Sequence, residues 1–374
     1  LYRGSLRGAM YYRLGVNRQI IELLEMLFPD GLDQLPHLSN PDRQAYVLNS
    51  LALGLSDQPG WAAALYSRSI DIEEQRGNLQ DICIGLWNMS NALRYCGSLR
   101  SSEIAVRRAL LISRQLDTPF SIRSPFSITR QPSNPFLEVG AHYELPTKRP
   151  LGDPFREAIG LQRLGITLAV RGEKLYSAKA VNRALALVDL HNMNETLKYY
   201  TLGFFEYHAL RIYDYLALCA LLFGQYSDAQ KFAARAMIFS KENRYELGMI
   251  RVMRLQGEAT LGLGELSMAD EQLHQALARA RVVNFMEEEL PALVGLAELR
   301  RRQGDIKAAR ELLDDVWEPA ERGPFRLFHA NAYNVLAQIE RNAGNREAAV
   351  RAALEAYRLA WCDGPPFAYH WGLE

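Results

Sequence analysis

The sequence has few cysteines, and none stands in a chemically useful pattern. Cys83, Cys96, Cys219 and Cys362 are the only four in 374 residues, and they lie far apart. No two of them form a Cys-x-x-Cys pair or stand near histidines at zinc-ligand spacing. We therefore expect buried free thiols and no metal site.

Long apolar runs are also missing. No stretch approaches the roughly 18 consecutive apolar residues that predict a transmembrane helix, and residues 1–15 lack the apolar core of a signal peptide. We expect a cytoplasmic protein that has no membrane partner. The chain begins at Leu1 rather than Met and ends within a run that reads as helix, which indicates a piece of a longer protein.

The sequence has no excess of charge of either sign. Its 43 Lys and Arg residues balance 43 Asp and Glu residues. Binding to nucleic acid relies on a clustered positive field, so we do not expect nucleic acid as a partner. Hydrophobic residues make up 48% of the chain and charged residues 23%, which is typical of a globular protein with a large core.

Motifs of enzymatic chemistry are absent as well. The sequence contains no Gly-Lys-Ser/Thr phosphate loop, no His-Glu-x-x-His, no Gly-x-Ser-x-Gly and no Gly-rich dinucleotide fingerprint. Its seven histidines are scattered singly. We interpret Glu287, Glu288 and Glu289 as first-turn residues that complement the positive end of a helix dipole. The chain is thus expected not to be an enzyme and to have no catalytic residue and no cofactor.

What the sequence does contain is a register that repeats every 40 residues. Small residues recur in one column, and a second column of small residues precedes it by 12 positions. Small side chains at paired positions let two helices approach closely, and a fixed period of this length indicates a solenoid. Apolar residues four and seven positions after the first column complete a helical stripe. We therefore predict an all-α solenoid of antiparallel helix pairs. The first column is Ala62, Ser102, Ser177, Ala229, Ala269, Ala309 and Ala349, and the second is Ser50, Ser90, Gly165, Ala217, Gly257, Ala297 and Ala337.

Two interruptions break this register. The step from Ser102 to Ser177 exceeds 40 residues by 35, and the step from Ser177 to Ala229 exceeds it by 12. We assign the first excess to an insertion at 117–154, where seven prolines forbid a regular helix, and the second to a shorter insertion at 190–203. We expect a degenerate unit to open the chain, with Ile20, Leu24 and Leu27 in its apolar stripe. Residues 1–374 are thus expected to form one domain of seven to eight repeats.

The most regular unit carries a family resemblance. Its order of aromatic, leucine, small residue, turn glycine, alanine, apolar residue and alanine resembles the tetratricopeptide repeat (TPR). The period of 40 residues is longer than that family's usual period of about 34. Elongated repeats of this kind are similar to the sensor arrays of signal-transduction ATPases of the STAND type, the bacterial relatives of NOD-like receptors. The resemblance implies a right-handed superhelix with an ATPase outside this chain. The matching residues are Tyr333, Leu336, Ala337, Gly344, Ala349, Ala353 and Ala356, with Leu161, Leu164, Gly165 and Ala184 in an earlier unit.

The resemblance also implies where a partner binds. In TPR solenoids the first helix of each pair lines a concave groove, and here those positions are rich in Arg and Asn, which suits hydrogen bonding to a peptide. The alternative for each residue is a solvated helix face, and for Trp87 it is packing between repeats instead of an anchor for the partner. The predicted groove residues are Trp87, Asn91, Arg94, Gln162, Arg211, Asp214, Arg251, Arg254, Glu258, Glu298, Arg301, Asn331, Asn334, Gln338 and Arg341.

Three functions fit this sequence. The first is a non-catalytic ligand-sensing or protein-interaction array in a larger bacterial STAND-type ATPase. Its partners would be a protein or peptide in the groove and other domains of the same polypeptide. The second is a stand-alone TPR scaffold or adaptor, and the third is a repeat region fused to an effector enzyme such as a protease or nuclease.

Overall fold

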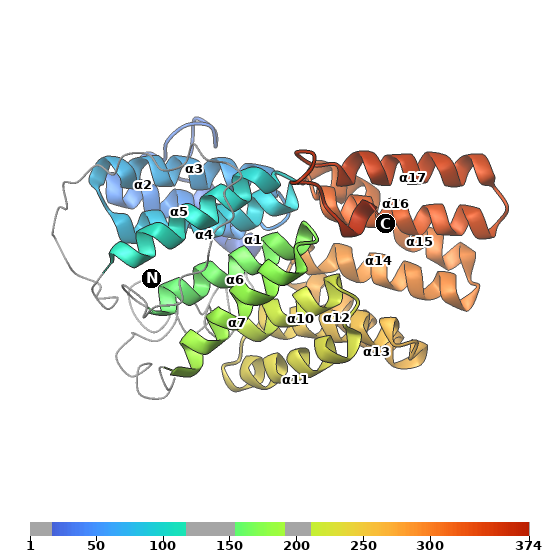
Figure 1. Ribbon diagram of the computed structural model, residues 1–374. Helices are drawn as coiled ribbons and strands as arrows, with labels where there is room; N and C mark the ends of the chain where they lie inside the picture. The colour runs from blue at the N-terminus through green and yellow to red at the C-terminus, as the bar shows by residue number, and fades with distance from the viewer. Residues whose placement is uncertain (1–16, 117–153, 191–210, 374) are drawn as a thin grey trace.

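A computed structural model describes residues 17–116, 154–190 and 211–373 of the chain (Figure 1). All regular secondary structure in these residues is helical, as the sequence predicts. A single helix, α1 (Asn17–Glu25), precedes seven helix pairs, and a short 3-10 helix, η3 (Trp371–Leu373), ends the described chain. The pairs are α2 (Pro41–Gly54) with α3 (Pro59–Arg76), α4 (Leu79–Tyr95) with α5 (Leu99–Gln115), α6 (Pro154–Val170) with α7 (Lys174–Leu190), α10 (Ile212–Leu222) with α11 (Tyr226–Glu242), α12 (Glu246–Gly262) with α13 (Leu266–Val282), α14 (Met286–Gln303) with α15 (Ile306–Arg322), and α16 (Arg326–Asn342) with α17 (Arg346–Ala360).

Each of the last four helix pairs has a glycine at its turn, five residues before the first-column residue. Gly224, Gly264, Gly304 and Gly344 have φ between 67° and 85°, a left-handed conformation that other residues adopt only with strain. A Cβ atom at any of the four would meet nothing within 4 Å, so backbone conformation and not space selects glycine there. Each turn ends the first helix of its pair and lets the second run back beside it.

The small columns mark where the two helices of a pair cross. A Cβ atom added to Gly165 would lie 2.3 Å from Cγ2 of Val181, and one added to Gly257 would lie 2.6 Å from Cγ of Leu273. In the second helices, Ala229 and Ala269 are fully buried. The predicted reason for the columns, close approach of the helix backbones, is therefore confirmed for these pairs.

The predicted insertions lie almost wholly outside the described residues. The described chain stops at 116 and resumes at Pro154, and it stops again at Leu190 and resumes at 211. The insertions at 117–154 and 190–203 therefore stay predictions. At the start of the chain, Ile20 on α1 is buried and Leu24 packs against the core of α2 and α3, as the stripe of the degenerate first unit predicts.

The two ends of the solenoid meet, which the sequence does not predict. In Figure 1 the early helices α2–α5 lie beside the late helices α16 and α17, and α6–α13 connect them along the other side. The Gly60 N–H donates to the Gly323 carbonyl at 3.1 Å. The Tyr95 ring, at the end of α4, lies 5.8 Å from the ring of Phe325 and 5.4 Å from that of Phe328. The first two helix pairs thus contact the turn before α16 and α16 itself.

The segment after α17, residues 361–373, completes this closure. His370 donates its backbone N–H to the Val170 carbonyl at 2.9 Å, and Arg171 Nε donates to the Pro366 carbonyl at 2.8 Å. Phe367 is buried, and its ring lies 4.9 Å from the Arg100 guanidinium and 4.4 Å from that of Arg171. We call residues 361–373 the closing segment, because they attach the last helix pair to the turns at the starts of α5 and α7.

All four cysteines are free, as expected. Cys83 and Cys219 are buried, and burial raises the pKa of the Cys96 and Cys362 thiols to about 11. The thiols are therefore protonated and unreactive at neutral pH. Within the described parts of the chain, no helix is both long and apolar enough to cross a bilayer.

Candidate functional site

The first helices of the pairs place charged side chains close together in the interior of the array. Five arginines and four carboxylates gather there, contributed by α4, α6, the start of α10, α12 and the first turn of α14. Most of these side chains are buried, although such residues are almost always exposed in proteins unless they are paired. We call this set the interior charge cluster: Arg94, Arg163, Arg211, Asp214, Arg251, Arg254, Glu258, Glu287 and Glu288.

Glu288 is the centre of the cluster and is only 1% exposed. Its carboxylate accepts from Arg251 Nε at 2.6 Å and from Arg254 Nε at 2.8 Å. Burial alone would raise the pKa of Glu288, but the two arginines outweigh burial and hold that pKa below its usual value. Arg254 also donates to Glu258 at 3.1 Å. The interpretation of Glu288 as a helix-dipole residue therefore misses its main role, which is a buried ion pair between α14 and α12.

Glu287 joins this cluster to the other end of the solenoid. It accepts from the Tyr95 hydroxyl at 3.3 Å and lies 3.5 Å from Arg251 Nη2. The Arg94 guanidinium lies 4.3 Å from the centre of the Tyr95 ring and donates to Asn91 Oδ1 at 2.7 Å. Polar contacts therefore run from α4 to α14 across the interior.

Several buried polar atoms at this site have no hydrogen-bond partner in the described residues. Arg211 Nε lies 3.9 Å from Asp214 Oδ2 and Arg251 Nη1 lies 4.0 Å from it, close enough for charge attraction but too far for a hydrogen bond. The Tyr215 hydroxyl and Ser56 Oγ are likewise buried and unpartnered within the part of the chain that is described. Such atoms cost free energy unless a ligand or solvent satisfies them.

The buried arginines act on two neighbouring titratable groups. Burial would raise the pKa of Tyr215, yet that pKa is lowered because Arg163, Arg211 and Arg251 favour the phenolate. Burial raises the pKa of Asp214 to about 6 in spite of Arg251 and Arg211. The arginines therefore outweigh burial at Tyr215 but not at Asp214.

A cavity of about 50 Å³ lies beside these atoms. Its wall is built from the end of α2, the start of α3, α4, α6, α12 and the residues just before α12 and α14. Apolar walls are supplied by Tyr66, Leu247 and Phe285. The cavity therefore lies between helices of the first two pairs and those of the fifth and sixth pairs, and a molecule in it would touch both groups. Its polar lining residues are Ser56, Asn88, Asn91, Arg163, Arg211, Arg251 and Glu287.

The structure brings together only part of the predicted groove set. Asn91, Arg94, Arg211, Asp214, Arg251, Arg254 and Glu258 all lie in or beside the interior charge cluster. Gln162 is buried, and its Nε2 has no hydrogen-bond partner in the described chain. Farther along the array, Glu298 pairs with Arg301 at 2.7 Å on α14 itself.

Other predicted groove residues are occupied or displaced. Trp87 is 1% exposed and packs with Ile82 and Ala109 in the core of α4 and α5, so it is a packing residue and not an anchor for a partner. Asn334 donates to the Gly372 carbonyl at 3.3 Å, and the Asn331 side chain hydrogen-bonds to Tyr369. The closing segment thus covers these two asparagines. Gln338 is half-buried and Arg341 is exposed on α16.

The sequence reasoning missed Ser56, Asn88, Arg163, Glu287 and Glu288. One feature of the sequence could have identified Glu288 as an inward-facing residue. It stands in the first turn of a helix, near the buried Leu290, and it follows Arg251 by 37 residues, which is about one period. Ser56 gives no such signal, because it reaches the cavity from the opposite end of the solenoid.

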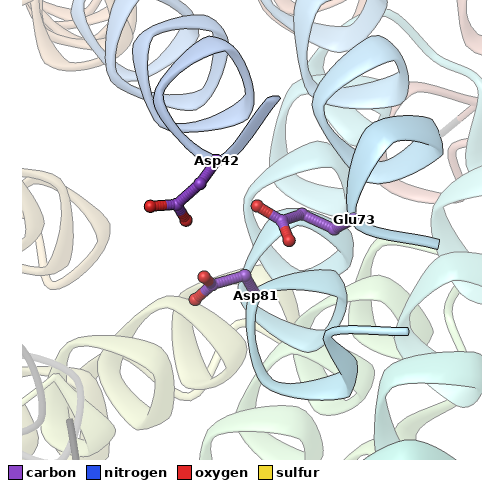
Figure 2. A group of neighbouring side chains, drawn as sticks. All are labelled: Asp42, Glu73 and Asp81. Carbon is purple, nitrogen blue, oxygen red and sulfur yellow. The ribbon is translucent and has the colours of Figure 1, made fainter. Parts of the chain in front are cut away.

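A second group of acidic side chains lies at the start of the array. Asp42, Glu73 and Asp81 point toward one another, with carboxylate oxygens within 4.8 Å (Figure 2). Arg76 lies 2.6 Å from Glu73 and 3.2 Å from Asp42, and Asn78 Nδ2 donates to Asp81 at 2.8 Å. All three carboxylates therefore already have protein donors, and the group carries no metal assignment.

Comparison with solved structures places this architecture among helical-repeat proteins. A Rap protein complexed with competence and sporulation factor is 12% identical, with a TM-score of 0.55 over 93% of this chain and 93% of that chain. Aspartyl phosphate phosphatase F from Bacillus subtilis is 12% identical, with a TM-score of 0.45 over 94% of this chain and 91% of that one. A tetratricopeptide repeat protein from Parabacteroides merdae is 13% identical, with a TM-score of 0.40 over 91% and 93%.

Protein-family models and curated protein sequences give no match to this chain. The Rap structure, at 12% identity, shows the fold alone. The chain is thus an all-α solenoid of TPR-like helix pairs.

Proposed function

We propose that the chain is a non-catalytic binding module that senses a ligand or partner in the interior of its solenoid. The observation that carries this proposal is the cavity lined by α2, α4, α12 and the start of α14, with buried arginine N–H groups that have no acceptor among the described residues. A protein that used its first helices only for packing would gain stability from apolar residues at these positions. Retained charges with unused hydrogen-bonding capacity are typical of a binding site.

Binding in this cavity has a direct route to a conformational response. Its lining comes from α2 and α4 on one side and from α12 and the start of α14 on the other. A ligand that contacts both sides favours the arrangement in which these helices lie together over any arrangement in which they separate. Part of the free energy of binding then stabilises this arrangement of the helices, as a sensor requires.

The finer form of the proposal is that the array is the sensor of a larger bacterial STAND-type ATPase, similar to NOD-like receptors. The 40-residue register supports this form, because it resembles the elongated repeats of such sensors. The Rap protein of similar fold is complexed with a factor, which supports a protein or peptide as one class of partner. A phosphate-binding loop encoded in the same polypeptide would support the ATPase connection, and a gene that encodes only repeats would refute it.

Affinity selection tests the binding function itself. The chain is incubated with a pooled library of short peptides and small metabolites, and retained molecules are identified by mass spectrometry. Asn91→Leu alters the cavity lining, and Asn342→Leu makes the same change at an exposed position of α16. We expect wild type and Asn342→Leu to retain the same molecules and Asn91→Leu to lose them. Equal retention by all three proteins, or no retention by wild type, would refute the proposal.

A further inference from the structure

We propose that the cavity binds the carboxylate group of a small ligand, held between the guanidinium groups of Arg211 and Arg251. This inference rests on the proposed binding function, because it names the chemical class that the same cavity accepts. Neither the fold similarity nor the repeat register points to this class of ligand.

The hydrogen-bond donors for such a ligand are the guanidinium groups of Arg211 and Arg251. Arg251 is 7% exposed; its Nε donates to Glu288 and its Nη2 lies 3.5 Å from Glu287, while its Nη1 has no acceptor in the described chain. Arg211 Nε likewise has no acceptor in the described chain, and both arginines line the cavity. A carboxylate offers two oxygens in one plane, which matches N–H donors of guanidinium groups better than any neutral group does.

Asp214 does not take this role itself. Its Oδ2 stays 3.9 Å from Arg211 Nε and 4.0 Å from Arg251 Nη1, and it has no hydrogen-bond partner in the described residues. The arginine donors are therefore attracted by Asp214 but not satisfied by it. Their hydrogen-bonding capacity stays available to a second carboxylate.

The charge of the donors favours an anion. Arg211 and Arg251 line the cavity, and their unpartnered Nε and Nη1 atoms belong to cationic groups. A cation would be repelled by these guanidinium groups, and a neutral ligand would be attracted less strongly than an anion.

Size and wall chemistry limit the ligand further. The cavity volume of about 50 Å³ exceeds the roughly 10–15 Å³ that one water needs and is about a third of the roughly 150 Å³ that admits benzene. A carboxylate with a short aliphatic chain fits this space, and a folded partner does not. The apolar walls of Leu247 and Phe285 suit the aliphatic part, and the buried Ser56 hydroxyl is a further donor from the opposite end of the solenoid.

Acetate is the probe for a titration of the full chain. Thermal unfolding is followed with increasing sodium acetate, and sodium chloride keeps the ionic strength constant. Acetamide serves as the neutral analogue, and inorganic phosphate serves as an anion of different shape. We expect acetate to raise Tm in a saturable way and acetamide to leave it unchanged, because a ligand stabilises only the state that binds it.

Matched substitutions locate the effect. Arg211→Lys keeps the charge but removes the planar fork, and it should weaken acetate binding about tenfold. Arg346→Lys makes the same change at an exposed position and should leave binding unchanged. Ser56→Ala is a milder second variant; it removes a buried hydroxyl with no partner in the described chain, should preserve the fold, and should weaken acetate binding a few-fold.

Three results would overturn the inference. Equal Tm curves in acetate and chloride would mean that the arginine donors are satisfied by water. Equal affinity of wild type and Arg211→Lys for acetate would show that Arg211 does not bind the ligand. Tighter binding of phosphate than of acetate would show that the cavity does not select a carboxylate. If affinity selection instead finds a ligand without an acidic group in this cavity, the carboxylate inference fails while the binding function stands.

Discussion

Replacement of Glu288 by glutamine tests whether the acidic first turn of α14 serves the helix dipole or the interior. Glu288 is 1% exposed and accepts from both Arg251 and Arg254. The glutamine keeps the shape of the side chain but removes the negative charge. Two buried guanidinium groups would then lose their common partner, and loss of one partner of a buried ion pair costs about 3–5 kcal/mol. We expect the free energy of unfolding to fall by about 3 kcal/mol, since glutamine still accepts one hydrogen bond.

Glu289→Gln is the matched control one residue further along the same helical turn. Within the described chain Glu289 pairs with Arg281. The Glu289 side chain is 15% exposed and that of Arg281 is 47% exposed, so the expected loss is about 1 kcal/mol or less. Both glutamates lie in the first turn of α14, where each interacts with the helix dipole by a similar amount, about 0.3–1 kcal/mol. The difference between the two variants therefore isolates the buried ion pairs.

Urea titrations followed by circular dichroism measure both losses. Hydrogen exchange of α12 and α14 adds a local measurement, because repeat arrays can unfold in parts. Equal losses of about 0.5 kcal/mol in the two variants would refute our reasoning and would favour the dipole interpretation.

Three further predictions concern packing, pH and closure. Gly257→Ala should lower the free energy of unfolding by about 1–2 kcal/mol in urea titrations, because the added Cβ would lie 2.6 Å from the buried Leu273 side chain. The control is Gly295→Ala, whose added Cβ would lie 3.3 Å from Leu273, and this variant should be neutral or stabilising. Burial, with nearby acidic groups, raises the pKa of Glu73 from 4.5 to about 7. Between these two pH values the unfolded chain loses this proton first, so the free energy of unfolding of the wild type should fall by up to about 3 kcal/mol as the pH rises. The free energy of unfolding of Glu73→Gln should not show this fall. Phe367→Ala should speed hydrogen exchange of the closing segment while α12 stays protected, and unchanged exchange would contradict its role in closure.

The repeat architecture could be predicted because its causes are local in the sequence. A helix pair is decided within 40 residues, by a turn glycine such as Gly264, by a crossing residue such as Gly257 and by the apolar stripe on each helix. These requirements leave a periodic trace that one sequence suffices to reveal. The same locality explains why α1 could be recognised from Ile20 and Leu24.

The candidate site could be predicted only in part. Arg251 and Arg254 were found because they share an inward face of one helix, but their partner Glu288 belongs to the next pair and was interpreted from its own helix alone. Trp87 was assigned to the groove because periodicity indicates the direction of a side chain but not which neighbouring helices pack against it. In the structure, neighbouring helices cover it completely.

The sequence by itself determined the all-α class, the helix pairing and the crossing points of the regular pairs. Only the tertiary structure decided that the two ends meet, that residues 361–373 hold them together, and that a polar cavity lies between α2–α4 and α12 with the start of α14. The physical reason is sequence distance: Tyr95 reaches Glu287 across 192 residues, and the Arg100 N–H reaches Asp363 across 263. The curvature of a solenoid accumulates from small rotations between successive pairs, so the faces that finally meet depend on the whole array and not on any single repeat.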